Sequence, residues 1–571
     1  MADVLRVGNC SGFYGDRLSA MREMLDGGAL DVLTGDYLAE LTMLILGRDQ
    51  LKDPSLGYAR TFVRQAEDCL GLALEQGVKI VANAGGLNPA GLAQKLREVA
   101  SGLGLTVSVA HVQGDNVLDR AADLGLGGSP LTANAYRGAF GIATALTHGA
   151  DVVVTGRVTD ASVVVGPAIA RFGWARTSYD ELAGAVVAGH VIECGAQATG
   201  GNFAGYVPDD RPLGFPLAEI AADGSCVVTK HDGTGGVVSV DTVTAQLVYE
   251  IQSTTYLGPD VSVDLASIRL SEDGPDRVRV SGVRGSAPPD TLKVCVNELG
   301  GWRKAAELVL VGLDVEQKAA WVRAQLTAAL AARPPASVDW SLARTDHVDA
   351  DTEEAASCRL RVTVRDPDRD TVGQAFTAPL VELALASYAG FTLTGPPAPA
   401  TPYGVYRAAY VPRSAVTEQV VLHDGTTTPL PPADPSGLQQ ETRSVVAEVT
   451  ARPVGPTGGP TRHLPLGYVA HARSGDKGGD ANIGVWARDG RTDRADWLRV
   501  FLTPDRVKAL LPETADLDVE VFELPNLGAV NVLVHGLLGE GVAASSRFDP
   551  QAKALGEWLR SRHVDVPEAL L

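Results

Sequence analysis

Five times within its first 170 residues, the chain passes from a short apolar run into a polar, glycine-rich loop and then into a helical pattern. The apolar runs cover residues 4–7, 30–33, 78–82, 106–110 and 151–154, and the loops after them contain GNCSGFYGDR, TGDY, NAGGLNP, HVQGDN and TGRVTDAS. Short strands that alternate with helices are typical of parallel α/β architecture. We therefore predict an α/β fold whose N-terminal part is a mostly parallel, Rossmann-like sheet.

In a parallel sheet, the loops after the strands emerge at one edge, and ligands bind there. Seven polar residues of these loops are therefore predicted to lie together and bind substrate: Asp36, Asn83, Asn88, Asp115, Asn116, Arg157 and Asp160. Arg157 suits a carboxylate or phosphate, and Asp160 is its partner or a catalytic base. The alternative is structural, because Asn and Asp are common in turns, and Thr159 or Asp160 can cap the following helix.

The length and charge of the chain narrow the classes of protein to which it can belong. A chain of 571 residues exceeds what one hydrophobic core usually supports, so we expect at least two domains. The formal net charge of −20 argues against nucleic acid and anionic membranes as partners. No apolar run reaches the roughly 18 residues of a membrane span, and no signal-peptide pattern is evident. We expect a cytoplasmic protein that forms a homo-oligomer.

The sequence offers no familiar metal or cofactor motif. Its six cysteines are scattered without a CxxC pair, which argues against a disulfide framework and a zinc knuckle. HExxH, GxxxxGK[ST] and GxSxG are absent, and no GxGxxG follows a strand. We therefore expect a protein that binds neither a metal nor a cofactor.

The patterning of the chain changes along its length. Residues 1–205 form the parallel block, and residues 206–410 show hairpin-like strands and helices that predict a mixed α+β extension. Proline-rich sequence from residue 411 predicts the start of a linker, which completes a first domain of residues 1–453. Residues 464–571 then follow a β-β-α-β-β-α order that suits a small, ferredoxin-like α+β domain. Within these regions we expect a helix at 133–148, a helix that starts at Pro167 and a strand at 237–240.

The segment RSGDKGGDAN at residues 473–482 is the densest polar cluster of the chain, and we interpret it as a loop. Arg473, Asp476, Lys477 and Asn482 supply charges and an amide, and the glycines let backbone N–H groups approach a phosphate or a thioester carbonyl. The alternative is a polar hairpin loop whose charges pair with one another. We predict that Arg473, Asp476 and Lys477 face the carboxyl edge of the N-terminal sheet, in the same or a neighbouring subunit, and complete one site with Arg157 and Asp160.

Two further segments suggest chemistry. HVIECGAQATGGNF brings His190, Glu193 and Cys194 within five residues, which predicts acid–base catalysis by His190 and Glu193 or a nucleophilic Cys194. Against the nucleophile, buried cysteines are usually small core residues. HDGTGG places Gly235 and Gly236 in a backbone cradle for substrate or, alternatively, in a glycine hairpin with a bulge.

Taken together, SGFYGDR, NAGGLNP, TGRVTDAS, AGHVIECGAQATGGNF, KHDGTGG and ARSGDKGGDANIG resemble the acyclic terpene utilisation AtuA family. The resemblance covers nearly the whole chain, with an AtuA domain over residues 1–453 and an AtuA-like ferredoxin-fold domain after it. It implies a place beside acyl-CoA carboxylases, dehydrogenases and hydratases in the breakdown of isoprenoid and branched acids. It carries over no catalytic residue.

These observations lead to three hypotheses. The first is an enzyme that acts on a small acyl-CoA thioester or carboxylic acid by metal-free proton transfer, in a reaction of the hydratase or lyase type. The second makes Cys194 an acyl acceptor for acyl transfer or thioester hydrolysis. The third is a non-catalytic assembly subunit of an acyl-CoA carboxylase complex.

Overall fold

The computed structural model describes residues 4–205, 210–430 and 459–571. The chain divides into two compact units, each with a core of its own. Unit 1 comprises Met1–Asn297, Tyr406–Val542 and Asp549–Leu571, and unit 2 comprises Glu298–Val405 and Ala543–Phe548. No helix in the described ranges combines the length and the apolar character needed to cross a membrane.

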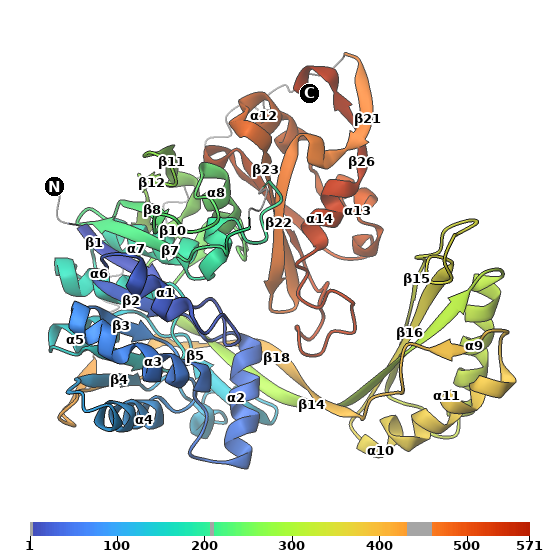
Figure 1. Ribbon diagram of the computed structural model, residues 1–571, viewed down its shortest axis with the longest axis horizontal. Coiled ribbons are helices and arrows are strands. Elements are labelled where there is room, and N and C mark those ends of the chain that lie inside the picture. Colours follow the sequence, from blue (N-terminus) through green and yellow to red (C-terminus); the bar gives the residue numbers. More distant parts are fainter. Residues whose placement is uncertain (1–3, 206–209, 431–458) are drawn as a thin grey trace. The chain divides into compact units, whose positions relative to one another are not determined.

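Unit 1 is built on an eleven-stranded sheet whose centre is parallel. The parallel strands, in their order across the sheet, are β1 (Val4–Asn9), β2 (Val32–Gly35), β3 (Lys79–Ala82), β6 (Val152–Thr155) and β4 (Val109–Gln113). They correspond to the five apolar runs, and the predicted strand–loop–helix repeat is confirmed for four of them (Figure 1). The exception is β4, which leads into a short 3-10 helix (Leu118–Arg120) and then into strand β5 (Pro130–Ala135). In chain order β6 is the last of these five strands, but in the sheet it lies between β3 and β4. This order differs from that of a standard dinucleotide-binding sheet.

Helices cover both faces of this sheet because neighbouring strand residues point to opposite sides. Ile80 and Val81 illustrate the alternation, since Ile80 belongs to the core under one set of helices and Val81 to the core under the other. The first set is α1 (Ala20–Gly27), α3 (Arg60–Gln76) and α4 (Pro89–Gly102). The second is α5 (Phe140–Thr147), α6 (Ser162–Phe172) and α7 (Tyr179–Ile192).

Antiparallel strands extend the sheet on both sides. Next to β1 lie β7 (Pro216–Ala221), β8 (Cys226–Lys230), β12 (Val278–Ser281) and β11 (Arg269–Glu272), and next to β4 lie β19 (Glu418–Val421) and β20 (Thr427–Leu430). The first part of the predicted α+β extension therefore continues the N-terminal sheet. Residues 418–430, which the sequence analysis assigns to the linker, are strands of that sheet, and residues 431–453 lie outside the described residues.

Three local predictions are corrected by the structure. The helix expected at 133–148 is strand β5 (Pro130–Ala135) followed by α5. Pro167 lies inside α6 rather than at its first turn. Residues 237–239 of the strand expected at 237–240 have no regular secondary structure, and Val240 begins α8 (Val240–Leu247), because Ser239 and Thr242 form a capping box that favours a helix over the β-branched pattern. A small sheet of β9 (Thr255–Leu257), β10 (Ser262–Asp264) and β13 (Arg284–Ser286) follows α8.

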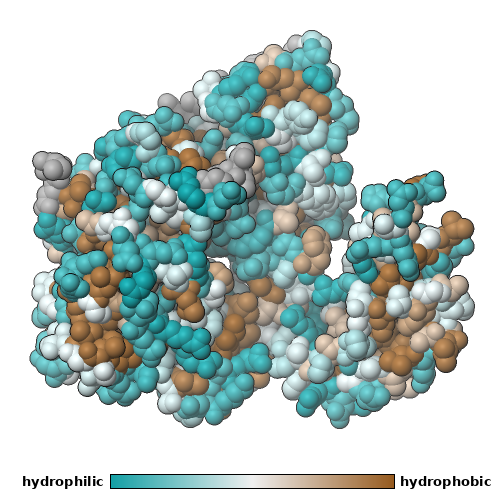
Figure 2. Space-filling model, viewed as in Figure 1, coloured by the Kyte–Doolittle hydropathy of each residue, from teal (hydrophilic) through white to brown (hydrophobic). Residues whose placement is uncertain are grey.

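Unit 2 packs helices against one antiparallel sheet. The sheet contains β15 (Ser337–Ala343), β16 (Ser357–Asp366), β14 (Thr291–Val311), β17 (Thr392–Leu393) and β18 (Thr401–Pro412), although the first residues of β14 and the last of β18 belong to unit 1. The helices are α9 (Val315–Leu330), α10 (Arg369–Val372) and α11 (Gln374–Ala386). Hydrophobic surface appears around α9 and α11, where Trp321, Val381 and Leu385 are exposed (Figure 2).

The C-terminal domain belongs to unit 1 and has a four-stranded antiparallel sheet. Its strands, in spatial order, are β22 (Ala470–Lys477), β23 (Asp480–Ala487), β25 (Ala529–Val534) and β24 (Val519–Leu524). Its helices are α12 (Thr492–Phe501), α13 (Pro504–Leu510) and α14 (Leu555–Ser561), and β21 (Thr461–Pro465) pairs with β26 (His563–Pro567). The predicted loop at 473–482 is therefore a tight hairpin, with only Gly478 and Gly479 between its strands.

This hairpin is polar because one face of its sheet packs on the rest of unit 1. Asn482 accepts a hydrogen bond from the Glu250 amide over 2.7 Å and donates one to the Val248 carbonyl over 2.9 Å. Gly484 leaves room for this approach, since a Cβ there would lie 2.6 Å from the Val248 carbonyl oxygen and closer still to its side chain. Residues 248–251, which directly follow α8, are thereby fixed to β23.

We predict that Gly484→Ala lowers the free energy of unfolding by about 1–3 kcal/mol, because the added methyl group meets backbone that cannot move aside. Thermal and urea unfolding measure the effect. Gly102→Ala is the matched control, since a Cβ at Gly102 meets no atom within 4 Å. Equal stability of the two variants would contradict the close contact.

Candidate functional site

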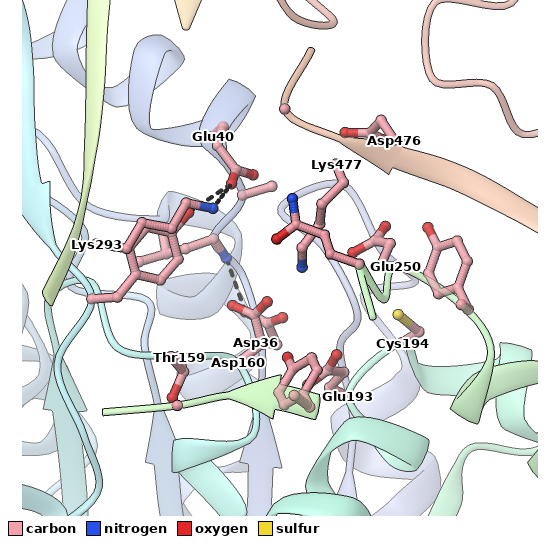
Figure 3. Close-up of a pocket in the computed structure, with 18 of the residues that line it drawn as sticks. Asp36, Glu40, Thr159, Asp160, Glu193, Cys194, Glu250, Lys293, Asp476 and Lys477 are labelled. Carbon is pink, nitrogen blue, oxygen red and sulfur yellow. Dashed lines mark hydrogen bonds and ion pairs between the residues drawn. The ribbon is translucent and has the colours of Figure 1, made fainter. Parts of the chain in front are cut away.

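A cavity of about 700 Å³ lies in unit 1 where three parts of the chain meet. Its walls come from the loops after the parallel strands, from residues that follow α8, and from the hairpin of the C-terminal domain. Its charged lining consists of Asp16, Asp36, Glu40, Arg157, Asp160, Glu193, Glu250, Lys293, Asp476, Lys477 and Lys553 (Figure 3). In the described ranges, no three His, Cys, Asp or Glu side chains are grouped so that they could hold a metal ion.

The loops after β2 and β3 together place Asp36 in the cavity wall. Asn83 donates a hydrogen bond to Asp36 Oδ1 over 2.5 Å, and the Leu38 amide donates to the same oxygen over 3.2 Å. Asn83 is fully buried and also accepts from the Tyr37 amide, so it positions Asp36 rather than lining the cavity. Burial, together with the charge of Asp160, raises the pKa of Asp36 well above its ordinary value. These surroundings therefore favour the protonated form of Asp36.

Arg157, after β6, is held on several sides. Its guanidinium donates to Asp160 over 2.7 Å and to the Leu38 carbonyl over 3.0 Å, and it lies 4.3 Å from the centre of the Tyr136 ring. Asp115 lies behind the cavity wall, where its Oδ2 accepts from the Arg157 amide over 2.8 Å. Asp115 therefore fixes the Arg157 loop, and the positive charge of Arg157 is already neutralised by Asp160.

A second ion pair, which the sequence analysis does not predict, lines the same side. Glu40 in α2 (Glu40–Lys52) accepts a hydrogen bond from Tyr136 over 2.6 Å and lies 3.5 Å from Lys293 Nζ. Burial opposes ionisation of Glu40, but the charges of Lys293 and Arg157 outweigh it and lower the pKa of Glu40 to about 2. Burial also lowers the pKa of Lys293. A lysine within the apolar strand sequence TLKVCV was the available signal for Lys293.

Glu193 lies at the end of α7 and is tied to β1. Asn9 donates to the Ile192 and Glu193 carbonyls over 2.8 and 3.0 Å. Glu193 Oε1 lies 3.2 Å from His190 Nδ1. The outer atoms of both groups, Glu193 Oε2 and His190 Nε2, are buried and have no hydrogen-bond partner among the described residues.

The protonation of this pair follows from its surroundings. Burial, with the charges of Asp160 and Glu250, raises the pKa of Glu193 well above its ordinary value. Burial and the charge of Lys477 lower the pKa of His190 to about 4. Burial therefore disfavours the charged form of both groups, and with a pKa of about 4 the imidazole is neutral at pH 7.

The segment fixed by Asn482 supplies the opposite wall. Lys553 contacts the Tyr249 hydroxyl and lies 3.6 Å from Glu250 Oε1. Arg473 lies 4.2 Å from the centre of the Tyr249 ring and donates to the Gln197 side chain. Burial raises the pKa of Glu250 to about 7, although the charge of Lys477 opposes the shift. Nothing in the sequence pattern around Glu250 or Lys553 predicts this role.

The structure brings together some of the predicted site residues and separates others. Seven of the predicted residues line the cavity: Asp36, Arg157, Asp160, Glu193, Cys194, Asp476 and Lys477. The hairpin and the N-terminal loops therefore meet as predicted, within one subunit. Asn83, Asp115, His190, Arg473 and Asn482 lie behind the wall, where they hold lining residues in place. These five are positioning residues because each of them holds a cavity-lining residue through a hydrogen bond or a ring contact.

Four predicted residues lie elsewhere. Asn88 is the N-cap of α4 and accepts from the Gly91 amide over 2.9 Å. Asn116 is exposed and accepts from the Leu118 amide in a local turn. Gly235 and Gly236 pack against the backbone of Arg211, Pro212 and Thr199, so their N–H groups form no cradle in the cavity. Asn88 and Asn116 therefore have the structural roles of the alternative interpretation. Gly235 and Gly236 lie between β8 and α8, so they form neither the cradle nor the alternative hairpin.

The fold and the site thus define an α/β protein whose cavity lies at the edge of the sheet and is closed by a small α+β domain. Residues 5–422 match the acyclic terpene utilisation family protein AtuA, and residues 464–565 match the AtuA ferredoxin-like domain. The chain belongs to the AtuA family. No curated protein is similar enough to the chain to count as a match.

We predict that Glu250 makes the protein less stable as the pH rises from about 4.3 to about 7. In this window the folded protein holds a proton on Glu250 that the unfolded chain has lost, so stability falls with rising pH by up to about 1.4 kcal/mol per pH unit. Glu250→Gln removes this contribution and flattens the curve of unfolding free energy against pH. Glu75→Gln, on an exposed position of α3, is the control. Parallel curves for wild type and Glu250→Gln would refute the assignment.

Proposed function

We propose that the protein is an enzyme that moves a proton on the carbon next to the carbonyl of a small acyl-CoA thioester or carboxylic acid, in a reaction of the hydratase or lyase type. The observation that carries the proposal is the free oxygen of Glu193, a buried carboxyl oxygen in a cavity-lining residue without a protein partner among the described residues. Buried polar groups are normally hydrogen-bonded, and an unpaired one at a cavity suits a ligand. A raised carboxyl pKa also suits a group that gives and takes protons near neutral pH.

Asp36 has the features of a hydrogen-bond donor to the substrate oxygen. Both hydrogen bonds that it accepts use Oδ1, which leaves Oδ2 without a bond to a described residue. Because burial favours the protonated form of Asp36, its O–H can donate to the oxygen on which negative charge builds up. In its carboxylate form Glu193 takes the proton from the carbon and returns it once protonated, while Asp36 stabilises the oxyanion.

His190 supports Glu193 from behind. It does not line the cavity, and its ring packs on Tyr256 with the ring centres 5.0 Å apart. Its Nδ1 lies at hydrogen-bonding distance from Glu193 Oε1, so it orients the carboxyl group and can share its proton. In this proposal His190 is a positioning residue, and Glu193 is the group that touches substrate.

The environment of Cys194 favours proton transfer over acyl transfer by a thiolate. Burial, together with the charges of Glu193 and Glu250, raises the pKa of the Cys194 thiol well above its ordinary value. The reactive form of cysteine is the thiolate, and nucleophilic cysteines usually lie beside groups that lower their pKa. Cys194 also lacks a paired base, since His190 lies against Glu193.

We predict that the protein exchanges the hydrogen on the carbon next to the thioester carbonyl with solvent deuterium. Butyryl-CoA, isovaleryl-CoA and an unsaturated isoprenoid acyl-CoA are incubated with the protein in D₂O, and mass spectrometry follows the label. We expect Glu193→Gln to slow exchange by about 10²–10⁴-fold, as loss of a general acid–base group does. Glu75→Gln keeps the wild-type rate, because Glu75 is exposed on α3.

Two results would count against this function. One is the absence of exchange with every thioester of the panel. The other is an unchanged rate in Glu193→Gln, which would show that another group moves the proton. Loss of exchange in Cys194→Ser together with an acyl adduct on Cys194 in wild type would instead support acyl transfer.

A further inference from the structure

Lys477 lines the cavity and has no ion-pair partner among the described residues. Arg157 pairs with Asp160 over 2.7 Å, Lys293 with Glu40 over 3.5 Å and Lys553 with Glu250 over 3.6 Å. Among the described residues, the Lys477 ammonium makes neither an ion pair nor a hydrogen bond, and it lies 5.8 Å from the centre of the Tyr256 ring. Its side chain extends from the end of β22 into the cavity, between Glu250 and the Asp36–Asp160 side (Figure 3).

The carboxyl groups around Lys477 are poor counterions. Burial raises the pKa of Glu193 and of Asp476 well above their ordinary values, which disfavours the negative charge of both groups. Glu250 is ionised only in part at that pH and is already shared with Lys553. The positive charge of Lys477 is therefore not cancelled by the groups nearest to it.

A cation in a partly desolvated cavity is normally paired, because an isolated charge loses hydration without compensation. An oxyanion that forms only during a reaction would leave Lys477 unpaired in the substrate complex. A permanent anion on the substrate would pair with it throughout. The donor set is also suitable, since an ammonium group binds a carboxylate as a point charge with short, charge-assisted hydrogen bonds.

We propose that the substrate carries a free carboxylate in addition to its reacting carbonyl group, and that Lys477 binds this carboxylate. The substrate is then a dicarboxylic acid or the monothioester of one. This inference rests on the proposed function, because it names the substrate class of the same cavity. In it, Lys477 selects the substrate, while Glu193 and Asp36 act on the reacting end.

The test is isothermal titration of the full-length protein at pH 7 with the dicarboxylates from malonate to adipate and with their neutral diamides. We expect at least one dicarboxylate to bind at least about tenfold more tightly than its diamide. Lys477→Met should weaken that dicarboxylate by at least about tenfold and leave the diamide within about threefold, which also shows that the cavity is intact. Lys508→Met, in the same domain but outside the cavity lining, should bind like wild type.

Three outcomes would overturn the proposal: no saturable binding of any dicarboxylate, equal affinity for acid and diamide, or unchanged dicarboxylate affinity in Lys477→Met. The deuterium exchange of simple acyl-CoA thioesters gives a separate readout. Exchange without carboxylate selectivity would leave the proton-transfer function standing and reject the role of Lys477. Carboxylate binding through Lys477 without any exchange would support the role of Lys477 and reject the proton-transfer function.

Discussion

The site depends on the contact between the Asn482 amide and the backbone that carries Glu250. Asn482 is fully buried, accepts from the Glu250 N–H group and donates to the Val248 carbonyl, so one side chain of the C-terminal sheet fixes a segment of the larger α/β part. Gly484 allows the close approach, and Lys477 lies further along the same face of the hairpin. The same contact therefore positions groups on both walls of the cavity.

Low hydration gives the cavity its chemical character. Four lining carboxyl groups, Asp36, Glu193, Glu250 and Asp476, have a raised pKa, and burial is the largest cause for each. Glu40 behaves in the opposite way because two cations and a tyrosine hydroxyl stabilise its charge. Carboxyl groups with a raised pKa and fixed ion pairs thus share one space, which suits acid–base chemistry near neutral pH.

The sequence predicts the central sheet because each strand is an uninterrupted apolar run before a glycine-rich loop, and it predicts Asp36, Arg157 and Asp160 because such loops share one edge. It places Arg473 and Asn482 in a loop, although both lie in strands. Polar residues in a strand can be recognised as part of a buried interface only when the part of the chain that packs on them is known. Glu40, Lys293 and Glu250 are missed for a similar reason, since contacts distant in sequence bring them to the cavity. The capping-box start of α8 at Ser239 was readable in principle, but the β-branched residues around it favoured a strand.

Hydrogen–deuterium exchange of residues 248–251 tests the central claim most directly. The Glu250 amide is held by a side chain of the C-terminal domain, so it should exchange slowly in the intact protein. Asn482→Ala should speed exchange in residues 248–251 and in residues 473–477, while the parallel strands keep their protection. Fast exchange of residues 248–251 in wild type, or no change in Asn482→Ala, would contradict a cavity that the C-terminal domain holds in place.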